Sequence, residues 1–336
     1  MLRPVHVAVL GGGSWGTTVA SIAAARATSV LWSRDPATAA EVNEHHRNSR
    51  YLGDAQLHPA LCATSSLEEA VYDADVIVIG VPSHAVRQTL REVAPFIRHW
   101  VPIVSLTKGL EEGSHLRMTQ VVQEELPGHP AGVLAGPNLA REVIAGYAAA
   151  AVMAMADAHV ANSLQQIFTT RRFRVYTNHD VAGCELGGAL KNVIAIAAGM
   201  ADGLGVGDNT KAMVLTRGLA EITRLGVALG GEARTFAGLT GLGDLMATCS
   251  SPLSRNRTVG VELAKGRTID EITSGMRMVA EGVKTCRVVV ELARAHGVES
   301  PIACEVDAVV NEGKAPLASF SGLGRVPPAS EFDGTA

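Results

Sequence analysis

The segment that most constrains the fold is an apolar run near the N-terminus that ends in closely spaced glycines. Residues 5–10 (VHVAVL) have the composition of a buried parallel strand, and GGGSWG follows directly at residues 11–16. The alanine-rich stretch 17–27 then predicts a helix. Glycines at Gly11, Gly13 and Gly16 permit a tight turn, and the helix N-terminus offers N–H groups to an anion. Glycine turns are common after strands, so the motif alone is weak evidence for dinucleotide binding. Its position at the first strand–helix junction is what favours that function.

Strands and helices continue to alternate over roughly the first half of the chain. Further apolar segments typical of buried strands are residues 29–32, 75–81 and 101–106, and residues 133–135, 149–155 and 174–176 extend the same series. Helical patterns such as 85–94 lie between them. This alternation predicts a doubly wound, Rossmann-type parallel sheet with right-handed crossovers.

The pattern changes near residue 180, beyond which strand signals almost vanish. Helices are predicted at residues 181–201, 211–229, 253–265, 269–275, 283–296 and 302–312. We therefore expect an α/β chain with a dinucleotide-binding domain at 1–180, an all-helical substrate domain at 181–325 and a loose tail at 326–336.

Composition excludes several classes of function. A length of 336 residues suits two domains, and a net charge of −4 gives no reason to expect nucleic acid or an anionic membrane as partner. The five cysteines are odd in number and form no CxxC pair, which argues against disulfides or zinc and fits a reducing cytoplasm. The chain starts without a signal-peptide pattern, and its longest uncharged alanine-rich stretch, 143–156, is too short to span a membrane. His45 and His46 lack spaced metal-ligand partners, so we expect no metal site.

The end of the second strand bears on the choice of cofactor. An NAD-selective site usually has an acidic residue there to bind the ribose hydroxyls. Here the strand ends in Ser33 and Arg34, and Asp35 comes one residue late. Serine and arginine suit a 2′-phosphate, although a solvated arginine after a strand would look the same. The sequence leaves NADH and NADPH both open.

Two lysines stand in places that favour function. Lys108 follows a strand, and the carboxyl ends of parallel strands face the ligand crevice. Lys191 interrupts an otherwise apolar helix rich in glycine, and burial would lower its pKa enough for proton transfer near neutral pH. The alternatives are an exposed loop lysine at position 108 and a lysine that reaches out to solvent at position 191.

Two later segments carry further polar groups. Asp244 and Thr248 are four residues apart and would share one face of a helix, although Asp244 could equally be an ordinary helix cap. The segment SPLSRNR at 251–257 gathers hydroxyls, an amide and two guanidiniums before a helix, a composition able to hold a phosphate. A solvated loop capped by Ser254 is the alternative.

Together these segments resemble the NAD(P)-dependent glycerol-3-phosphate dehydrogenase family, in its bacterial form, over roughly residues 5–320. The resemblance is carried by GGGSWGTTVA, SLTKGLE, ELGGALKNVIAIAAGMADGLGVGDNTKA and GLGDLMATCSSPLSRNRTVG, of which the last two are long and specific. The resemblance implies that the protein interconverts dihydroxyacetone phosphate and sn-glycerol 3-phosphate with NAD(P)H. It also implies that the glycerol 3-phosphate is supplied for phospholipid synthesis. We also expect a homodimer in the cytoplasm.

The resemblance assigns roles to the matching positions. It implies that Lys191 is the proton donor and acceptor, that Lys108 acts at the reacting carbonyl, and that Asp244 belongs to the catalytic group. Implied cofactor contacts are Gly11, Gly13, Ser14, Trp15, Gly16, Arg34, Tyr51, Lys108, Ala140, Arg255, Val279 and Glu281. Implied substrate contacts are Lys108, Gly136, Asn138, Lys191, Asp244, Thr248, Ser254, Arg255 and Asn256. Bacterial members commonly have Ser or Thr at the position of Asn138, whereas animal-type members have Asn.

Two other functions remain possible from the sequence. One is another dehydrogenase with a Rossmann and a helical domain, acting on a hydroxy acid or a hydroxyacyl thioester. The other is a dinucleotide-binding regulator without turnover. The phosphate-type SPLSRNR segment disfavours the first, and the presence of Lys108, Lys191 and Asp244 disfavours the second.

Overall fold

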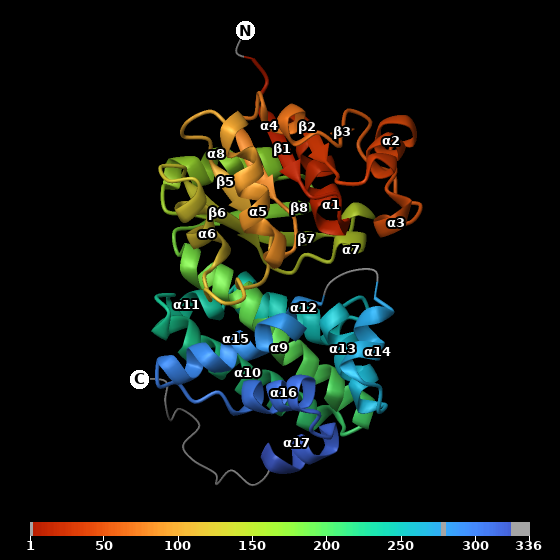
Figure 1. Cartoon of the computed structure of the whole chain (residues 1–336), viewed down its shortest axis with the longest axis vertical. Coiled ribbons are helices and arrows are strands. Elements are labelled where there is room, and N and C mark those ends of the chain that lie inside the picture. Colours follow the sequence, from red (N-terminus) through yellow and green to blue (C-terminus); the bar gives the residue numbers. More distant parts are fainter. Residues whose placement is uncertain (1–2, 277–279, 324–336) are drawn as a thin grey trace. The chain divides into compact units, whose positions relative to one another are not determined.

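The computed structural model describes residues 3–276 and 280–323, and the chain divides into two compact units (Figure 1). The first unit comprises Met1–Thr107 and Leu116–Val181, and the second comprises Lys108–His115 and Ala182–Ala336. The short segment 108–115 thus belongs with the helical unit, which the sequence did not indicate. Val279 and the expected tail at 326–336 lie outside the described residues.

The described part of the first unit contains an eight-stranded sheet in the order β3-β2-β1-β4-β5-β6-β7-β8. The strands are β1 (His6–Leu10), β2 (Thr28–Trp32), β3 (Cys62–Thr64), β4 (Val76–Ile79), β5 (Ile103–Ser105), β6 (Ala131–Ala135), β7 (Ala149–Met155) and β8 (Phe173–Asn178). The short edge strand β3 was not predicted, because three residues carry too little pattern.

One pair of strands departs from the expected parallel sheet. β6 and β7 are antiparallel, with Gly132 opposite Met155, whereas every other pair is parallel. Between them lies only the five-residue helix α7 (Ala140–Ile144). A parallel pair needs a crossover that carries the chain back along the strands, usually an α-helix. The five residues of α7 rise only about 7.5 Å, whereas the five residues of β6 span about 17 Å. The short helix therefore does not return the chain to the start of a parallel strand, and β7 runs in the opposite direction.

Helices cover both faces of this sheet. The remaining helices of the first unit are α1 (Ser14–Ala23), α2 (Pro36–His45), α3 (Ser49–Leu52), α4 (Leu67–Val71), α5 (Ser83–Val93), η1 (Ala94–Phe96), α6 (Met118–Glu125) and α8 (Ala158–Phe168). Along β1, Val7 and Val9 belong to one buried cluster, whereas Ala8 and Leu10 belong to another. Successive side chains of a strand point to opposite faces, so two cores explain why the strands are apolar throughout.

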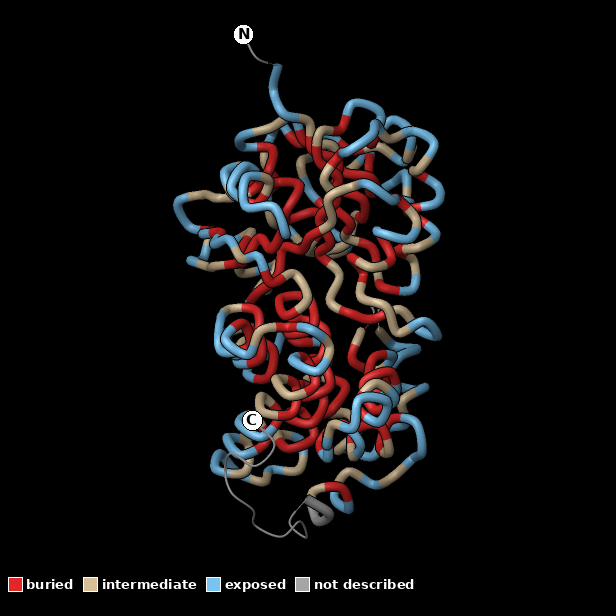
Figure 2. Tube along the Cα trace, turned by 90° about the vertical axis from the view of Figure 1, so that its left-hand side faces the viewer, coloured by how far each residue is buried: buried red, intermediate tan, exposed pale blue. Residues whose placement is uncertain are grey.

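The described residues of the second unit after residue 181 form helices joined by loops. Its helices are α9 (Val181–Leu204), α10 (Asp208–Ala228), α11 (Ala233–Phe236), η2 (Leu239–Gly243), α12 (Asp244–Ser250), α13 (Arg255–Ala264), α14 (Ile269–Ser274), α15 (Glu281–Ala295), α16 (Pro301–Glu312) and α17 (Pro316–Leu323). By length and composition α9 could cross a membrane, but 89% of its most apolar window is buried in the protein. Buried segments run through the interior of each unit (Figure 2). α9 is therefore the core helix of this unit.

The glycines of α9 allow other backbone segments to approach it closely. A Cβ atom at Gly187 would lie 2.6 Å from the carbonyl oxygen of Thr240 in η2. One at Gly188 would lie 3.5 Å from the side chain of Lys108. Glycine costs about 1 kcal/mol in a helix interior, and this close packing accounts for its presence. Both contacts lie beside Lys191, so the same glycines shape its surroundings.

Candidate active site

The glycine turn of the first unit joins β1 to α1. Gly11 has φ +136°, and a Cβ atom there would lie 2.6 Å from the carbonyl carbon of Gly80, so no other residue fits without displacement. A Cβ atom at Gly16 would lie 2.1 Å from the carbonyl oxygen of Gly11. The N-cap position of α1 is Gly13, which provides no side-chain cap. The turn therefore holds the amides of the first helical turn in a fixed direction.

Two features of this turn fit the pyrophosphate of a dinucleotide. A Cβ atom at Gly13 would meet no protein atom within 4 Å, so the space above the turn is open. The indole Nε1 of Trp15 is buried and has no acceptor among the described residues. Open space beside uncapped helix amides and a nearby unpaired donor suits a close anionic ligand.

The end of β2 places its polar residues differently from a ribose-binding strand. Asp35 caps α2 by accepting a hydrogen bond from the Ala37 N–H at 3.1 Å, and it pairs with Arg50 at 3.5 Å. Its carboxylate is thus engaged by the protein. Arg34 is exposed at the end of the strand, and the Arg50 guanidinium lies 5.4 Å from the ring centre of Tyr51. The cations Arg34 and Arg50 at this end of β2 could attract a 2′-phosphate, and the carboxylate of Asp35 is already engaged by protein groups.

The connection after β6 carries the three other expected contacts of the first unit. Gly136 has φ +126°, and a Cβ atom there would lie 3.2 Å from the Cα of Ala151. The side-chain nitrogen and oxygen of Asn138 are both buried without a partner among the described residues. Ala140 begins α7, which contacts α1. This connection therefore lies near the helix of the glycine turn and presents an unsatisfied amide.

The second unit brings three charged side chains together from distant segments. Asp244 accepts a hydrogen bond from Lys108 Nζ at 2.7 Å through Oδ2 and from Lys191 Nζ at 3.0 Å through Oδ1. Lys191 Nζ also contacts the hydroxyl of Thr248, which donates to Asp244 at 3.2 Å. Lys191 and Asp244 are buried, whereas the Lys108 side chain is 19% exposed. We call these four residues the lysine–aspartate cluster.

This arrangement changes the acidity of its members. Burial lowers the pKa of Lys191 to about 8; the Asp244 carboxylate opposes that shift, and the charge of Lys108 adds to it. Burial opposes ionisation of Asp244, but the charges and hydrogen bonds of Lys108 and Lys191 outweigh it, so its pKa lies below the usual value. With both ammonium groups and the carboxylate ionised, the cluster has a net positive charge. It can give up or accept a proton near neutral pH.

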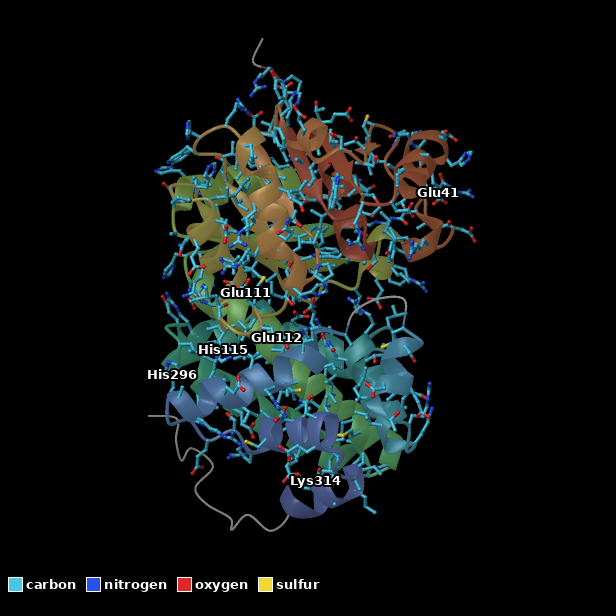
Figure 3. The ribbon with its side chains drawn as sticks, in the orientation of Figure 1. Glu41, Glu111, Glu112, His115, His296 and Lys314 are labelled. Atoms are coloured by element: carbon cyan, nitrogen blue, oxygen red, sulfur yellow. The ribbon has the colours of Figure 1, made fainter. Side chains whose placement is uncertain are left out.

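Lys108 is tied to the second unit by more than its ammonium group. Asn192 donates from Nδ2 to the Lys108 carbonyl oxygen at 2.9 Å, and Leu110 belongs to the helical core. At the end of the segment His115, labelled in Figure 3, lies 2.9 Å from Glu291 of α15. The segment 108–115 is therefore anchored to α9 at its start and to α15 at its end.

An amide network extends from the cluster to α15. Asn256 Nδ2 donates to Asn192 Oδ1 at 2.8 Å, and Asn256 Oδ1 accepts from the Gly282 N–H at 3.0 Å. Glu281, the first residue of α15, precedes that amide. These bonds link the Lys108 backbone to the start of α15 through two buried amides. Nothing in the sequence indicated a role for Asn192, because its partners are distant in the chain.

The SPLSRNR segment contains both structural and exposed groups. Ser254 caps α13 by accepting from the Arg257 N–H at 3.3 Å, which confirms the capping interpretation of that residue. Arg257 pairs with Asp202 of α9 at 2.6 Å. Arg255 is the first residue of α13 and is exposed. Of the two arginines, Arg257 is engaged in the ion pair with Asp202, and Arg255 is the more exposed residue.

Comparison with known proteins agrees with this geometry. Residues 6–161 match the model of the NAD-dependent glycerol-3-phosphate dehydrogenase N-terminus, and residues 180–321 match that of its C-terminus. The chain belongs to the NAD-dependent glycerol-3-phosphate dehydrogenase family.

Members of this family are similar over nearly the whole chain. A glycerol-3-phosphate dehydrogenase [NAD(P)+] of Sphingopyxis alaskensis is 59% identical over 95% of this chain and 96% of its own. One of Mycobacterium avium is 56% identical over 99% and 98%. The crystal structure of glycerol-3-phosphate dehydrogenase from Coxiella burnetii covers 96% of this chain and 99% of its own, with 36% identity and a TM-score of 0.91. The family resemblance and the fold class inferred from the sequence are thus confirmed, apart from the antiparallel pair.

Proposed function

We propose that this chain interconverts dihydroxyacetone phosphate and sn-glycerol 3-phosphate with NAD(P)H. The observation that carries the proposal is the lysine–aspartate cluster, in a chain related to glycerol-3-phosphate dehydrogenases [NAD(P)+] over almost its full length. A reducible ketone needs a proton for the oxygen that becomes a hydroxyl. Buried Lys191, with a pKa of about 8, supplies one at neutral pH.

NAD(P)H, when bound, supplies the hydride that reduces the ketone carbon. Lys191 in its ammonium form gives its proton to the oxygen as negative charge develops there, and the neutral amine removes the hydroxyl proton in the reverse direction. Thr248 and Asp244 hold Nζ in place through their oxygens. The proton donor is therefore oriented before the substrate arrives.

Lys108 and Asp244 adjust the charge around the reacting oxygen. Lys108 adds a second positive charge that favours the alkoxide over the neutral ketone. Asp244 favours the ammonium form of buried Lys191, and the same carboxylate also bonds to Lys108. One carboxylate between two lysines leaves one net positive charge for the developing anion.

The substrate phosphate requires a separate group of residues. Arg255, exposed at the start of α13, and Asn256, whose amide is oriented by Asn192 and Gly282, hold the phosphate in this proposal, with Ser254 beside them. Fixing the phosphate orients the carbonyl and reduces the entropy lost in reaching the transition state.

The remaining assigned roles are proposals of the same kind. Gly11, Gly13, Ser14, Trp15 and Gly16 would contact the pyrophosphate side of the dinucleotide, with Arg34, Tyr51, Lys108, Ala140, Arg255, Val279 and Glu281 as further contacts. Substrate would also meet Gly136, Asn138 and Thr248. We further infer a homodimer that works in the cytoplasm and supplies glycerol 3-phosphate for phospholipid synthesis. The divisions at 180 and 325 are proposed as domain boundaries.

The test is oxidation of NADH and of NADPH by purified protein, followed by absorbance with and without dihydroxyacetone phosphate. We expect oxidation that depends on this ketone and reverses with sn-glycerol 3-phosphate. A panel of keto acids and ketoacyl thioesters separates the competing dehydrogenase activities. Turnover with those compounds and none with dihydroxyacetone phosphate would overturn the proposal, as would dinucleotide binding without any turnover.

A further inference from the structure

Asn48, to which the sequence assigned no role, is tied to the glycine turn. Its side chain is completely buried. Nδ2 donates to the carbonyl oxygen of Gly12 at 2.9 Å and to the hydroxyl of Thr17 at 2.8 Å. Gly12 belongs to the turn itself, and Thr17 lies in the first part of α1. One amide group from a segment 36 residues away thus holds both sides of the turn.

The Gly12 carbonyl matters because of the peptide plane to which it belongs. The carbonyl of Gly12 and the N–H of Gly13 are in one planar trans peptide, so they point in opposite directions. A hydrogen bond that fixes the carbonyl therefore also fixes the direction of the N–H. On its other side Gly12 is confined by Ser33, since a Cβ atom at Gly12 would lie 2.8 Å from the Ser33 hydroxyl. The peptide has little freedom to rotate.

The ordinary explanation for a buried asparagine before a helix does not fit here. Asn48 occupies the N-cap position of α3, yet its side chain makes no capping hydrogen bond to that helix. Its Oδ1 has no donor among the described residues, so both bonds it makes run through Nδ2 to the turn and α1. An amide that caps no helix but donates twice to the dinucleotide turn has its effect at that turn.

We propose that Asn48 is a positioning residue for the cofactor pyrophosphate, acting through the Gly12–Gly13 peptide. It keeps the Gly13 N–H directed toward the open space above the turn, where it donates to a phosphate oxygen. The inference rests on the dinucleotide part of the proposed function and not on the identity of the substrate. Because NADH and NADPH share the pyrophosphate, the effect of Asn48 is the same for both.

The experiment measures dissociation constants of NADH and NADPH by fluorescence for wild type and Asn48→Ala. We expect both constants to rise by the same factor, on the order of tenfold for one lost hydrogen bond to an oriented group. The kcat at saturating cofactor and the KM for dihydroxyacetone phosphate should stay within about twofold of wild type. In the presence of cofactor, hydrogen exchange at the Gly13 amide should be faster in the variant than in wild type.

Two further variants separate positioning from general stability. Asn43→Ala is a matched control, because Asn43 also makes two hydrogen bonds, at 2.9 and 2.8 Å to the Ala63 backbone, but none to the turn. It should lower the melting temperature without changing cofactor affinity. Asn48→Leu keeps the number and branching of the side-chain heavy atoms while removing the donor, so it serves if the alanine variant does not fold. It should weaken both cofactors as Asn48→Ala does.

Two results would overturn the inference. One is a folded Asn48→Leu protein that binds both cofactors with wild-type affinity. The other is an Asn43→Ala protein that loses as much affinity, which would trace the effect to stability. Failure of the proposed function looks different: wild type would bind dinucleotide, and Asn48→Ala would bind it less, yet dihydroxyacetone phosphate would not be reduced.

Discussion

The glycine turn and the lysine–aspartate cluster are both suited to bind negative charge, but they use different groups to do so. The turn uses backbone amides, and its residues are contiguous between Gly11 and Gly16. The cluster uses full charges on side chains from three segments, at Lys108, Lys191 and Asp244. The first requires the absence of side chains, and the second requires particular ones. Loss of a cluster side chain should therefore damage chemistry, whereas changes at the turn should alter affinity for the cofactor.

The largest effect is expected for Lys191→Ala. The alkoxide would lose its positioned proton donor, which should cost about 10²–10⁴-fold in kcat, while cofactor affinity changes little. Asp244 would still be paired with Lys108 at 2.7 Å, so the fold should survive. The measurement is kcat and the NADPH dissociation constant on protein shown by circular dichroism to be folded. Lys211→Ala is the control, because Lys211 pairs with Asp202 at 2.6 Å outside the cluster.

A kcat for Lys191→Ala within about threefold of wild type would remove Lys191 as the proton donor and leave Lys108 as the candidate. Comparable loss of activity in Lys211→Ala would mean that breaking any lysine pair in this unit disturbs the site.

The second-largest effect is expected for Arg255→Ala. A lost charge-assisted bond is worth about 1.5–3 kcal/mol, or roughly 10- to 150-fold in kcat/KM for dihydroxyacetone phosphate. We expect kcat to fall and KM to rise, since the phosphate also orients the carbonyl. With the unphosphorylated ketone as substrate, inorganic phosphite should activate wild type more than the variant. Equal activation of the two proteins would rule out Arg255 as the phosphate ligand.

Arg34→Ala tests how the end of β2 distinguishes NADPH from NADH. Asp35 is engaged as a helix cap and by Arg50, so the exposed Arg34 is the residue able to bind a 2′-phosphate at the end of β2. Its removal should weaken NADPH about tenfold or more and leave NADH nearly unchanged. Dissociation constants for the two cofactors measure this directly. Equal losses for both would show that Arg34 does not recognise the 2′-phosphate.

The smallest effect is expected for Gly13→Ser, which adds a side chain where the turn has none. Nothing in the protein lies within 4 Å of a Cβ atom there, and serine is a better N-cap than glycine by a few tenths of a kcal/mol. Stability should hold or rise slightly, while the new hydroxyl competes for the first-turn amides and weakens both cofactors about threefold or more. Thermal melting tests the expected stability, and cofactor titration tests the expected loss of affinity. Unchanged affinity would mean that these amides do not bind the pyrophosphate.

The same contrast explains what could be predicted from the sequence. The glycine turn was recognisable because its spacing is local and because Gly11 and Gly16 leave no room for a Cβ atom. Lys191 was recognisable as a charge in an apolar helix, but its partner Asp244 lies 53 positions away. Lys108, which also bonds to Asp244, lies 136 positions from it. Asn48 gave no signal, since its partners Gly12 and Thr17 lie in another segment. The antiparallel β6–β7 pair was missed because strand direction depends on the connection rather than on strand composition.

The proposed chemistry depends most on Lys191 as a proton donor, whose pKa is lowered by burial and kept from falling further by Asp244. The most direct measurement is the pH dependence of kcat/KM for ketone reduction, from about pH 6 to about pH 10, in wild type and Asp244→Asn. Reduction needs the ammonium form, so the wild-type rate should fall as pH rises through the Lys191 pKa of about 8. The Asp244 carboxylate raises that pKa, so in Asp244→Asn the fall should begin at lower pH. A wild-type rate that does not fall across this range, or a fall at the same pH in both proteins, would contradict the account.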